Sequence, residues 1–443
     1  MTAMRLTLQL YTSGSWRDVM HLEFEKPELG QNSPCSFAYD QHYLVDHLNA
    51  LGSSTGQSVS ARIPLSWDLY RTPGLPAFLL DILPAGAARR FLLARLAIPE
   101  RNHTSADLIL LERCTPAPVG HLRIKESLEA LATGNSIGFD RNEVVTRDSR
   151  FLEYAYEQGA AVSGATGAGG EAPKLLLAED ADGLMHPDAT LADENVHQHW
   201  FVKFSRKKGN ETDRTILRSE FCYYQALELI GVDVVSCDGM SLEEARKPSL
   251  WMKRFDRRVT AQGVRRLGVE SVYSLADITR PGSYMSHVQA ITVLANAWSS
   301  NGQDDEIPAL VAEYLRRDLI NQVLGNSDNH GRNTSILRDE KRLVLAPIYD
   351  LAPMVMDEEG VTRTTKWPDP IERAGEVDWL AACRSLATWA DPDQLFEGLK
   401  ADARRLLALP DLLSEGGLPQ QTFTHPRIAL PRLHPTFRAW GLA

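Results

Sequence analysis

The sequence is short of cysteine, of long apolar runs and of positive charge, and each shortage excludes a class of protein. Its 443 residues include five widely spaced cysteines and no Cys-x-x-Cys pair, so neither a disulfide framework nor a zinc site is expected. No apolar run approaches the length of a membrane span, and the first residues alternate in polarity instead of forming a signal-peptide block. The net charge of −11 gives no overall signature of nucleic-acid or anionic-membrane binding. We therefore expect a cytoplasmic protein outside the membrane, without direct sequence-specific DNA binding.

What is present fits a soluble protein of two or three domains. Hydrophobic residues make up 43% of the chain and charged residues 24%, which is ordinary for globular proteins. The first part alternates in polarity between breaker clusters and predicts β-structure, and a mixed polar stretch follows it. These shifts predict a β-rich N-terminal domain over 1–150, a second domain over 151–256 and a mostly helical third over 257–443.

The most informative stretch runs from Asn321 to Pro353. It contains Asp328, then Asn333 five positions later, two short strand-like runs, and then Asp350. This is the order of a kinase catalytic loop and its metal-binding aspartate. Asp328 would take the proton of the acceptor hydroxyl, and Asn333 and Asp350 would hold Mg²⁺ between phosphates. The alternative for this stretch taken alone is a polar turn followed by a β-hairpin.

Three features upstream have the order of a kinase small lobe. The glycine-rich residues 163–174 could wrap phosphate oxygens with backbone amides, although a flexible linker has the same composition. Lys203 lies in an apolar strand and needs a partner if it is buried. Glu220, in the helix that we expect to start at Ser219, is the candidate partner, although an exposed first-turn glutamate is equally consistent.

The strand around Lys253–Phe255 follows, where an adenine-contacting hinge would lie, and after it the pattern becomes helical. Helices are predicted from Met285 to Trp298 and from Ile307 to Val323, and the catalytic loop would hang from the second. We therefore predict an α+β protein with a two-lobed, protein-kinase-like fold, in which the β-rich N-terminal domain is fused to the small lobe and the C-terminal lobe is mostly helical.

These residues resemble those of the HipA-type serine/threonine protein kinases, bacterial toxins usually encoded beside a DNA-binding antitoxin, and most of all the longer branch named YjjJ. The matching segments are Ser36–Asp40, Phe78–Gly86, Glu171–Lys174, Val202–Phe204, Glu220, Arg254–Arg257, Gly325–Asn333 and Leu345–Asp350.

The resemblance implies ATP and Mg²⁺ as cofactors, Asp328 as proton acceptor, and transfer of phosphate to a protein serine or threonine. In characterised members the target is an aminoacyl-tRNA synthetase, and growth stops or persistence follows. The implied ATP-binding residues are Gly169, Gly170, Glu171, Ala172, Pro173, Lys174, Lys203, Lys253, Arg254, Phe255, His330, Gly331, Arg332, Asn333, Tyr349 and Asp350.

One position departs from the family pattern. The family's glycine-rich loop commonly carries an inhibitory autophosphorylation serine, and alignment on Lys174 places Gly167 there. Thr166 or Ser163 could take its place, or self-inhibition could be absent.

Two other functions remain open from the residues. Asp328, His330 and Asn333 also have the spacing found in small-molecule phosphotransferases of the aminoglycoside and choline type. A nucleotide-binding regulatory or DNA-associated scaffold would account for the N-terminal region, which kinase chemistry does not require.

Overall fold

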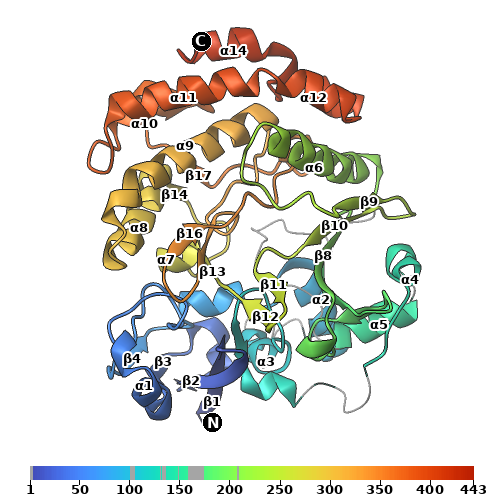
Figure 1. Cartoon of the computed structure of the whole chain (residues 1–443), viewed down its shortest axis with the longest axis vertical. Helices are drawn as coiled ribbons and strands as arrows, with labels where there is room; N and C mark the ends of the chain where they lie inside the picture. The colour runs from blue at the N-terminus through green and yellow to red at the C-terminus, as the bar shows by residue number, and fades with distance from the viewer. Residues whose placement is uncertain are drawn as a thin grey trace.

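The structure is a computed structural model. It describes residues 3–99, 105–129, 131, 136–147, 149–157, 174–206 and 209–443. Three regions follow one another from the N-terminal sheet at one end of the molecule to the last helices at the other (Figure 1).

The N-terminal region, residues 3–129, is built on a five-stranded antiparallel sheet in the order β4-β3-β2-β1-β5. Its elements are β1 (Met4–Thr12), β2 (Ser15–Phe24), β3 (Cys35–Tyr39), α1 (Gln41–Asp46), β4 (Tyr70–Thr72), α2 (Gly86–Arg95), α3 (Ala106–Arg113) and β5 (Leu122–Ile124). The predicted alternation at the start of the chain is confirmed, because Leu6, Leu8 and Leu10 of β1 are all buried. They share a core with Leu108 and Leu111 of α3, and this core is separate from those of the other regions.

A second antiparallel sheet, in the order β7-β6-β8-β10-β9, forms the middle region. The elements of this region are α4 (Arg141–Thr146), α5 (Ser149–Glu157), β6 (Lys174–Glu179), β7 (Met185–Pro187), β8 (Gln198–Phe204), α6 (Glu211–Leu229), β9 (Ser241–Glu243) and β10 (Ser249–Lys253). Phe139 and Phe151 pack in the core of this sheet beside Trp200 and Trp251. The middle region therefore begins before the predicted boundary at residue 150. That boundary falls inside α5.

The C-terminal region contains short strands followed by helices. Its strands are β11 (Arg257–Thr260), β12 (Gly263–Arg266), β13 (Gly268–Ser271), β14 (Met285–Ser286), β15 (Ser335–Arg338), β16 (Leu343–Leu345), β17 (Thr365–Lys366), β18 (Glu372–Arg373) and β19 (Glu376–Val377). Its helices are α7 (Val272–Leu275), α8 (His287–Ser300), α9 (Ile307–Leu324), α10 (Trp379–Arg384), α11 (Pro392–Leu406), α12 (Leu409–Glu415), α13 (Gln420–Phe423) and α14 (Leu433–Ala439). Both long helices predicted here, α8 and α9, are confirmed. The core of the region also includes Tyr223 and Leu227 of α6, so the middle sheet is anchored to it by that helix.

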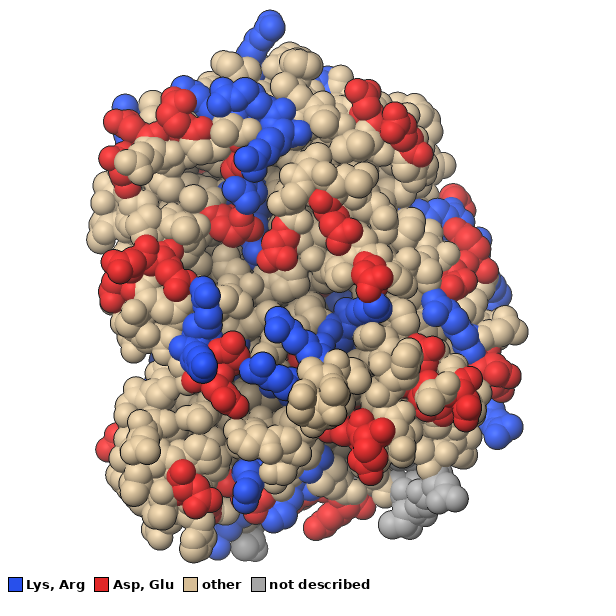
Figure 2. Space-filling model, viewed as in Figure 1, with Lys and Arg blue, Asp and Glu red and all other residues tan. Residues whose placement is uncertain are grey.

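The charged surface agrees with the modest net charge. On the face drawn in Figure 2, acidic and basic side chains are interspersed, and basic ones gather in the middle, where Figure 1 places β11 and β12. Among the residues that the structure describes, no helix has both the length and the apolar composition needed to cross a bilayer.

The N-terminal region is joined to the rest of the chain by buried charged groups. Asp256 accepts a hydrogen bond from the backbone N–H of Gly120, at 2.7 Å. Arg254 and Arg257, on either side of Asp256, donate to the carbonyl oxygen of Pro118 at 3.2 and 3.1 Å. All three charged side chains are buried, so this junction is fixed by hydrogen bonds that water does not reach.

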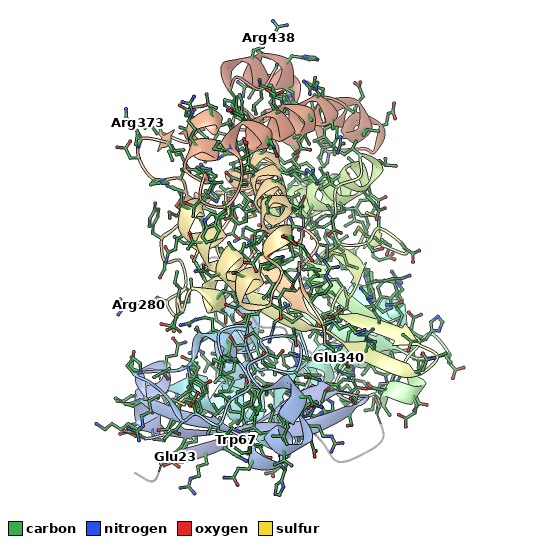
Figure 3. The ribbon with its side chains drawn as sticks, turned by 60° about the vertical axis from the view of Figure 1, so that its left-hand side comes forward. Glu23, Trp67, Arg280, Glu340, Arg373 and Arg438 are labelled. Carbon is green, nitrogen blue, oxygen red and sulfur yellow. The ribbon has the colours of Figure 1, made fainter. Side chains whose placement is uncertain are left out.

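A second junction lies at the β15–β16 turn, where Glu340 marks the level at which the N-terminal region begins in Figure 3. The backbone N–H of Gly56 donates to the carbonyl oxygen of Asp339 at 2.6 Å. A Cβ at Gly56 would lie 2.7 Å from that oxygen, so only glycine permits this approach.

Arg338 is the main contact of this second junction. Its buried guanidinium donates to the carbonyl oxygens of Thr55, Ser58 and Val59 at 3.1, 2.9 and 3.0 Å. It also lies 3.5 Å from the carboxylate of Glu270. That carboxylate accepts a hydrogen bond from the backbone N–H of Ala61 in the N-terminal region. One side chain thus satisfies three carbonyl groups and one buried carboxylate.

We expect Arg338→Met to lower the free energy of unfolding by about 3–5 kcal/mol, because three buried carbonyl groups would lose their donor and the buried Glu270 would lose the cation beside it. Arg342→Met is the matched control. Arg342 lies on the same hairpin, but its side chain is 54% exposed and pairs with Glu306 at the surface, so about 0.5 kcal/mol or less should be lost. Urea unfolding followed by tryptophan fluorescence measures both, and equal midpoints would contradict the expectation.

Candidate active site

The predicted catalytic loop hangs from the C-terminal end of α9, as its sequence indicates. The helix ends at Gly325, which has a φ of +69°; a Cβ there would lie 2.8 Å from side-chain carbons of Ile428 and Val355. Asn333 reaches back across the loop, and its Nδ2 donates to the carbonyl oxygen of Asp328 at 2.8 Å. The five-residue spacing therefore closes the loop on itself. A polar turn followed by the β15–β16 hairpin would also contain such a bond, so the catalytic roles of Asp328 and Asn333 remain predictions.

Asp328 lies in a setting that disfavours its charged form. Burial, and next the negative charge of Asp350, raise its pKa to about 6, although Arg206, Lys174 and Lys203 act in the opposite direction. The nearest ring nitrogen of His330 is 3.6 Å from its carboxylate, beyond hydrogen-bond distance. A carboxylate with a pKa nearer neutrality is a better proton acceptor than one on the surface.

Two lysines meet one aspartate beside this loop. Lys174 of β6 and Lys203 of β8 are paired directly across the two strands, so their side chains leave the same face of the sheet. The Nζ of Lys174 lies 2.9 Å from one carboxylate oxygen of Asp350, and the Nζ of Lys203 lies 2.5 Å from the other. Asp350 thus compensates two buried ammonium groups that would otherwise repel one another.

Glu220 completes this cluster. Its carboxylate lies 2.5 Å from the Nζ of Lys203, and it accepts a hydrogen bond from the hydroxyl of Tyr224 at 2.9 Å. The sequence expectation for the helix was wrong, because α6 begins at Glu211 and Glu220 is a buried residue in its middle. The alternative of an exposed first-turn glutamate is therefore excluded, whereas the predicted partnership with Lys203 is present.

The electrostatics of the cluster follow from these pairs. Burial lowers the pKa of Lys174, and the charge of Lys203 lowers it further. Burial acts on Lys203 in the same way, but Asp350 and Glu220 outweigh it and raise its pKa. Burial would raise the pKa of Asp350, but the two lysines together lower it. The raised pKa of Lys203 and the lowered pKa of Asp350 favour the charged forms of these two groups, and the ammonium groups offer donors for anionic oxygens.

A cavity with largely apolar walls opens on the lysine cluster. Phe255 and Tyr349 lie in its wall with their rings stacked, 5.6 Å apart between centroids. Its lining includes Phe201, Met252, Phe255 and Val269 together with Lys174, Lys203, Glu220, Tyr349 and Asp350. A flat aromatic group with an anionic tail fits such walls.

A second, smaller cavity begins at the same cluster and extends to Asp328. It shares Lys174, Lys203, Glu220 and Asp350 with the first cavity, and it adds Arg206 and Asp328 among its lining residues. The lysine cluster therefore lies where the two cavities meet, and Asp328 lies on the side away from the apolar walls.

Three other predicted ATP-binding residues line the first cavity with varied roles, whereas His330, Gly331 and Asn333 are absent from its lining. Lys253 lines it and pairs with Asp238 at 2.5 Å. Arg254 also lines it, but its guanidinium is bound to Asp188 and Asp256, so that side chain is committed to the protein. Arg332 lines it as well, and one of its terminal nitrogens binds the N-terminal region.

His330 and Gly331 form the turn of the catalytic loop. The ring of His330 stacks on Tyr273 with 6.1 Å between centroids, and burial lowers its pKa to about 4. A Cβ at Gly331 would lie 2.2 Å from the ring of Tyr273. Tyr273 therefore fixes this turn, and only glycine fits beneath its ring.

Several predicted residues lie outside those that the structure describes. They are Gly169, Gly170, Glu171, Ala172 and Pro173 of the glycine-rich loop, and the candidate autophosphorylation residues Thr166 and Ser163. Their roles remain predictions.

Asp81 and Tyr224 are two of the residues at the site that were not predicted. Asp81 comes from the N-terminal region and lines the first cavity. The only indication of it in the sequence was its position in the segment Phe78–Gly86, which resembles the HipA-type kinases. Tyr224 binds Glu220 from one helical turn away, and the four-residue spacing could have indicated it.

The donors present fit a divalent cation held partly by phosphate. Within the described ranges, no three His, Cys, Asp or Glu side chains are grouped as a metal site. The Oδ1 of Asn333 is buried and has no hydrogen-bond partner there, and an unpartnered amide oxygen is a suitable ligand for Mg²⁺. Asn333 and Asp350 remain the predicted ligands.

The raised pKa of Asp328 predicts how activity depends on pH. A base must be unprotonated, so kcat/KM for phosphoryl transfer should fall about tenfold for each pH unit below about 6 and level off above it. A profile from about pH 5 to 8 measures this in the free enzyme. The residual activity of Asp328→Asn should lack this acidic limb; the same limb in the variant would assign it to another group.

The comparisons with known proteins agree with this fold. The model of the HipA-like C-terminal domain matches residues 166–405, more than half of the chain. The chain therefore belongs to the HipA-type kinase family, and the resemblance read from its motifs is confirmed.

Two proteins of Sinorhizobium fredii, Y4mE and Y4dM, both carry the word kinase in their names. The chain is 30% identical to the first over 128 residues and 27% identical to the second over 179 residues. These stretches are 28% and 39% of this chain, and they span only 30% and 41% of the two relatives.

A solved structure extends the likeness in fold to nearly the whole chain. HipA of Shewanella oneidensis, in a complex with HipB and its operator DNA, matches with a TM-score of 0.66, covering 98% of this chain and 97% of that one at 18% identity. The N-terminal region is therefore part of a shared fold.

Proposed function

We propose that the protein is a serine/threonine protein kinase of the HipA toxin type, which transfers the γ-phosphate of ATP to another protein and so arrests growth. The observation that carries the proposal is the meeting of two cavities at the Lys174, Lys203 and Asp350 cluster, with Asp328 in the second cavity. In this reading the middle sheet with α6 is the small lobe of a two-lobed kinase fold, and the C-terminal helices form the large lobe.

Each cavity would take one substrate. The adenine would lie between the apolar walls of the first cavity, near the hinge Lys253–Phe255 and Tyr349, because flat rings bind well to aromatic and aliphatic surfaces. The phosphates would then reach Lys174 and Lys203, whose charges suit anionic oxygens. The predicted phosphate contacts of the glycine-rich loop belong to residues that lie outside the described part of the chain.

The reaction needs few groups beyond these. The acceptor hydroxyl oxygen would attack the γ-phosphorus while the bond to the β–γ bridging oxygen breaks, and ADP would leave. Asp328 would take the hydroxyl proton. Bound Mg²⁺, held by Asn333 and Asp350, would neutralise charge on the phosphates. Lys203, fixed by Glu220, would keep the phosphate chain in place.

The acceptor and the partners are also proposals. The family resemblance favours a cytosolic acceptor protein, with an aminoacyl-tRNA synthetase as the first candidate. The related HipA structure contains HipB and operator DNA, which supports a DNA-binding antitoxin as partner here. In this view DNA contact would come through the partner, in keeping with the mixed surface charge.

The test is transfer of label from γ-labelled ATP with Mg²⁺. Purified wild-type protein and Asp328→Asn are incubated alone and in cell lysate, and labelled proteins are identified by mass spectrometry. A discrete protein labelled by the wild type and not by the variant would support the proposal. Label on Thr166 or Ser163 would show autophosphorylation. Equal labelling would refute the proposal, and label on a metabolite alone would favour a small-molecule kinase.

A further inference from the structure

The N-terminal region touches the catalytic loop through two consecutive residues at the end of a 3-10 helix, Ala77–Asp81. The carbonyl oxygen of Leu80 accepts a hydrogen bond from the guanidinium of Arg332 at 2.9 Å. Next to it, the two carboxylate oxygens of Asp81 accept from the backbone N–H and the hydroxyl of Ser271 at 2.8 and 2.7 Å. A carboxylate from the start of the chain therefore holds a residue 190 positions away.

Ser271 passes this constraint to the loop. It is the N-cap of α7, and its hydroxyl oxygen accepts from the N–H of Ser274 at 3.1 Å. The next two backbone N–H groups, of Val272 and Tyr273, donate to the carbonyl oxygens of Thr334 and Gly331 at 3.0 and 3.1 Å. The first turn of α7 is thus bonded to both ends of the segment 331–334.

The ring of Tyr273 adds a second contact with the same segment. It stacks on His330 and leaves no space for a side chain at Gly331. Asp81, Ser271 and Tyr273 therefore form a continuous series of contacts from the N-terminal region to the loop that carries Asp328 and Asn333.

Packing alone does not require a carboxylate at this position. Asp81 lies in the wall of the first cavity, where burial raises its pKa to about 6 despite the charge of Arg332. An apolar side chain would avoid this cost of burying charge. What the carboxylate adds is two directional hydrogen bonds to a single residue, which fix the position of α7.

We propose that Asp81 is a positioning residue for phosphoryl transfer, and that through Ser271 and α7 it holds residues 330–333 in their working conformation. The inference rests on the proposed kinase function. It gives the N-terminal region a direct part in the site.

The test compares Asp81→Ala, Asp81→Asn, Ser271→Ala and the double variant Asp81→Ala/Ser271→Ala. Loss of the contact should lower kcat about 10–100-fold; the KM for ATP should rise less than the affinity falls in Asp350→Asn, because residues 330–333 shift while the lysine cluster is untouched. Asp81→Asn keeps one acceptor oxygen and should recover part of the loss. The double variant should lose less than the sum of the two single effects, since both substitutions break the bond between the Ser271 hydroxyl and the Asp81 carboxylate.

Asp40→Ala is the matched control. Asp40 also lies in the N-terminal region and caps α1 by accepting from the N–H of Tyr43 at 3.0 Å, so its loss costs stability without touching the loop. Its kcat should equal that of the wild type. A fall in kcat as large as that of Asp81→Ala would show a general effect of destabilisation and overturn the inference.

Hydrogen exchange of the amides of 330–334 provides a readout that does not depend on activity. Asp81→Ala should raise their exchange rate at least about tenfold, and Asp40→Ala should not. Unchanged exchange and unchanged kcat in Asp81→Ala would overturn the inference. A wild type that exchanges slowly but transfers no phosphate would instead refute the proposed function, and the exchange of the variants would still decide the role of Asp81.

Discussion

Asp328→Asn should lower phosphoryl transfer about 10²–10⁴-fold and leave the affinity for ATP with Mg²⁺ within about threefold of the wild type. The substitution keeps the size of the side chain and the backbone carbonyl that accepts from Asn333, so the loop should keep its shape. It removes the only function assigned to the carboxylate, which is to take a proton. It also removes a negative charge from the vicinity of Asp350, which raised the pKa of Asp328.

Two measurements separate this expectation from a structural effect. Isothermal titration gives the affinity for a non-hydrolysable ATP analogue, and single-turnover kinetics give the rate of transfer. Because burial of the charged carboxylate is unfavourable, the variant should be at least as stable as the wild type. Weaker nucleotide binding in parallel with the lost rate would show that Asp328 also holds the nucleotide, against the division of roles proposed above.

Asp350→Asn should give the opposite pattern, with Mg²⁺-dependent ATP affinity lowered about 100-fold or more. The carboxylate compensates both Lys174 and Lys203, and an amide offers only one acceptor oxygen and no charge. The two ammonium groups, paired across β6 and β8, would then repel one another. Removing one partner of a buried ion pair costs about 3–5 kcal/mol of stability, so a lower unfolding midpoint is expected as well.

Titrations with and without Mg²⁺ test the role of Asp350. In the wild type the ion should strengthen nucleotide binding, and in Asp350→Asn it should have little effect. Asp328→Asn serves as the matched control, because it neutralises another carboxylate of the same cavity. The same defect in both variants would contradict separate roles for the base and the metal ligand.

Features made by residues close together in the sequence could be predicted better than contacts between distant residues. The bond between Asn333 and Asp328 spans only five residues, but the spacing predicted a base and a metal ligand here and not this bond. The Lys203–Glu220 pair was predicted from the order of motifs, although the start of α6 was misplaced by eight residues. Asn210 and Asp213 form a capping box at the true start, so a signal for it was present in the sequence and was missed.

Contacts between distant parts of the chain could not be predicted in the same way. Asp81 and Ser271 both lie in ordinary-looking segments, and nothing in their composition shows that they meet. Arg338 lies in a short strand with the sequence Ser-Ile-Leu-Arg, where an arginine usually reads as exposed. Arg338 is buried because it donates to carbonyl groups of the N-terminal region. Only folding brings the arginine and these carbonyl groups together.

The contacts of Arg338 also have a consequence for the order in which the protein is made. Val59, whose carbonyl oxygen Arg338 binds, leaves the ribosome 279 residues ahead of it. At about 5–20 residues per second, this interval lasts roughly tens of seconds. The N-terminal sheet has its own apolar core and can fold during synthesis, but its loop 55–59 must wait, solvated, for the arginine. The nascent chain therefore completes this buried junction only after residue 338 has left the ribosome.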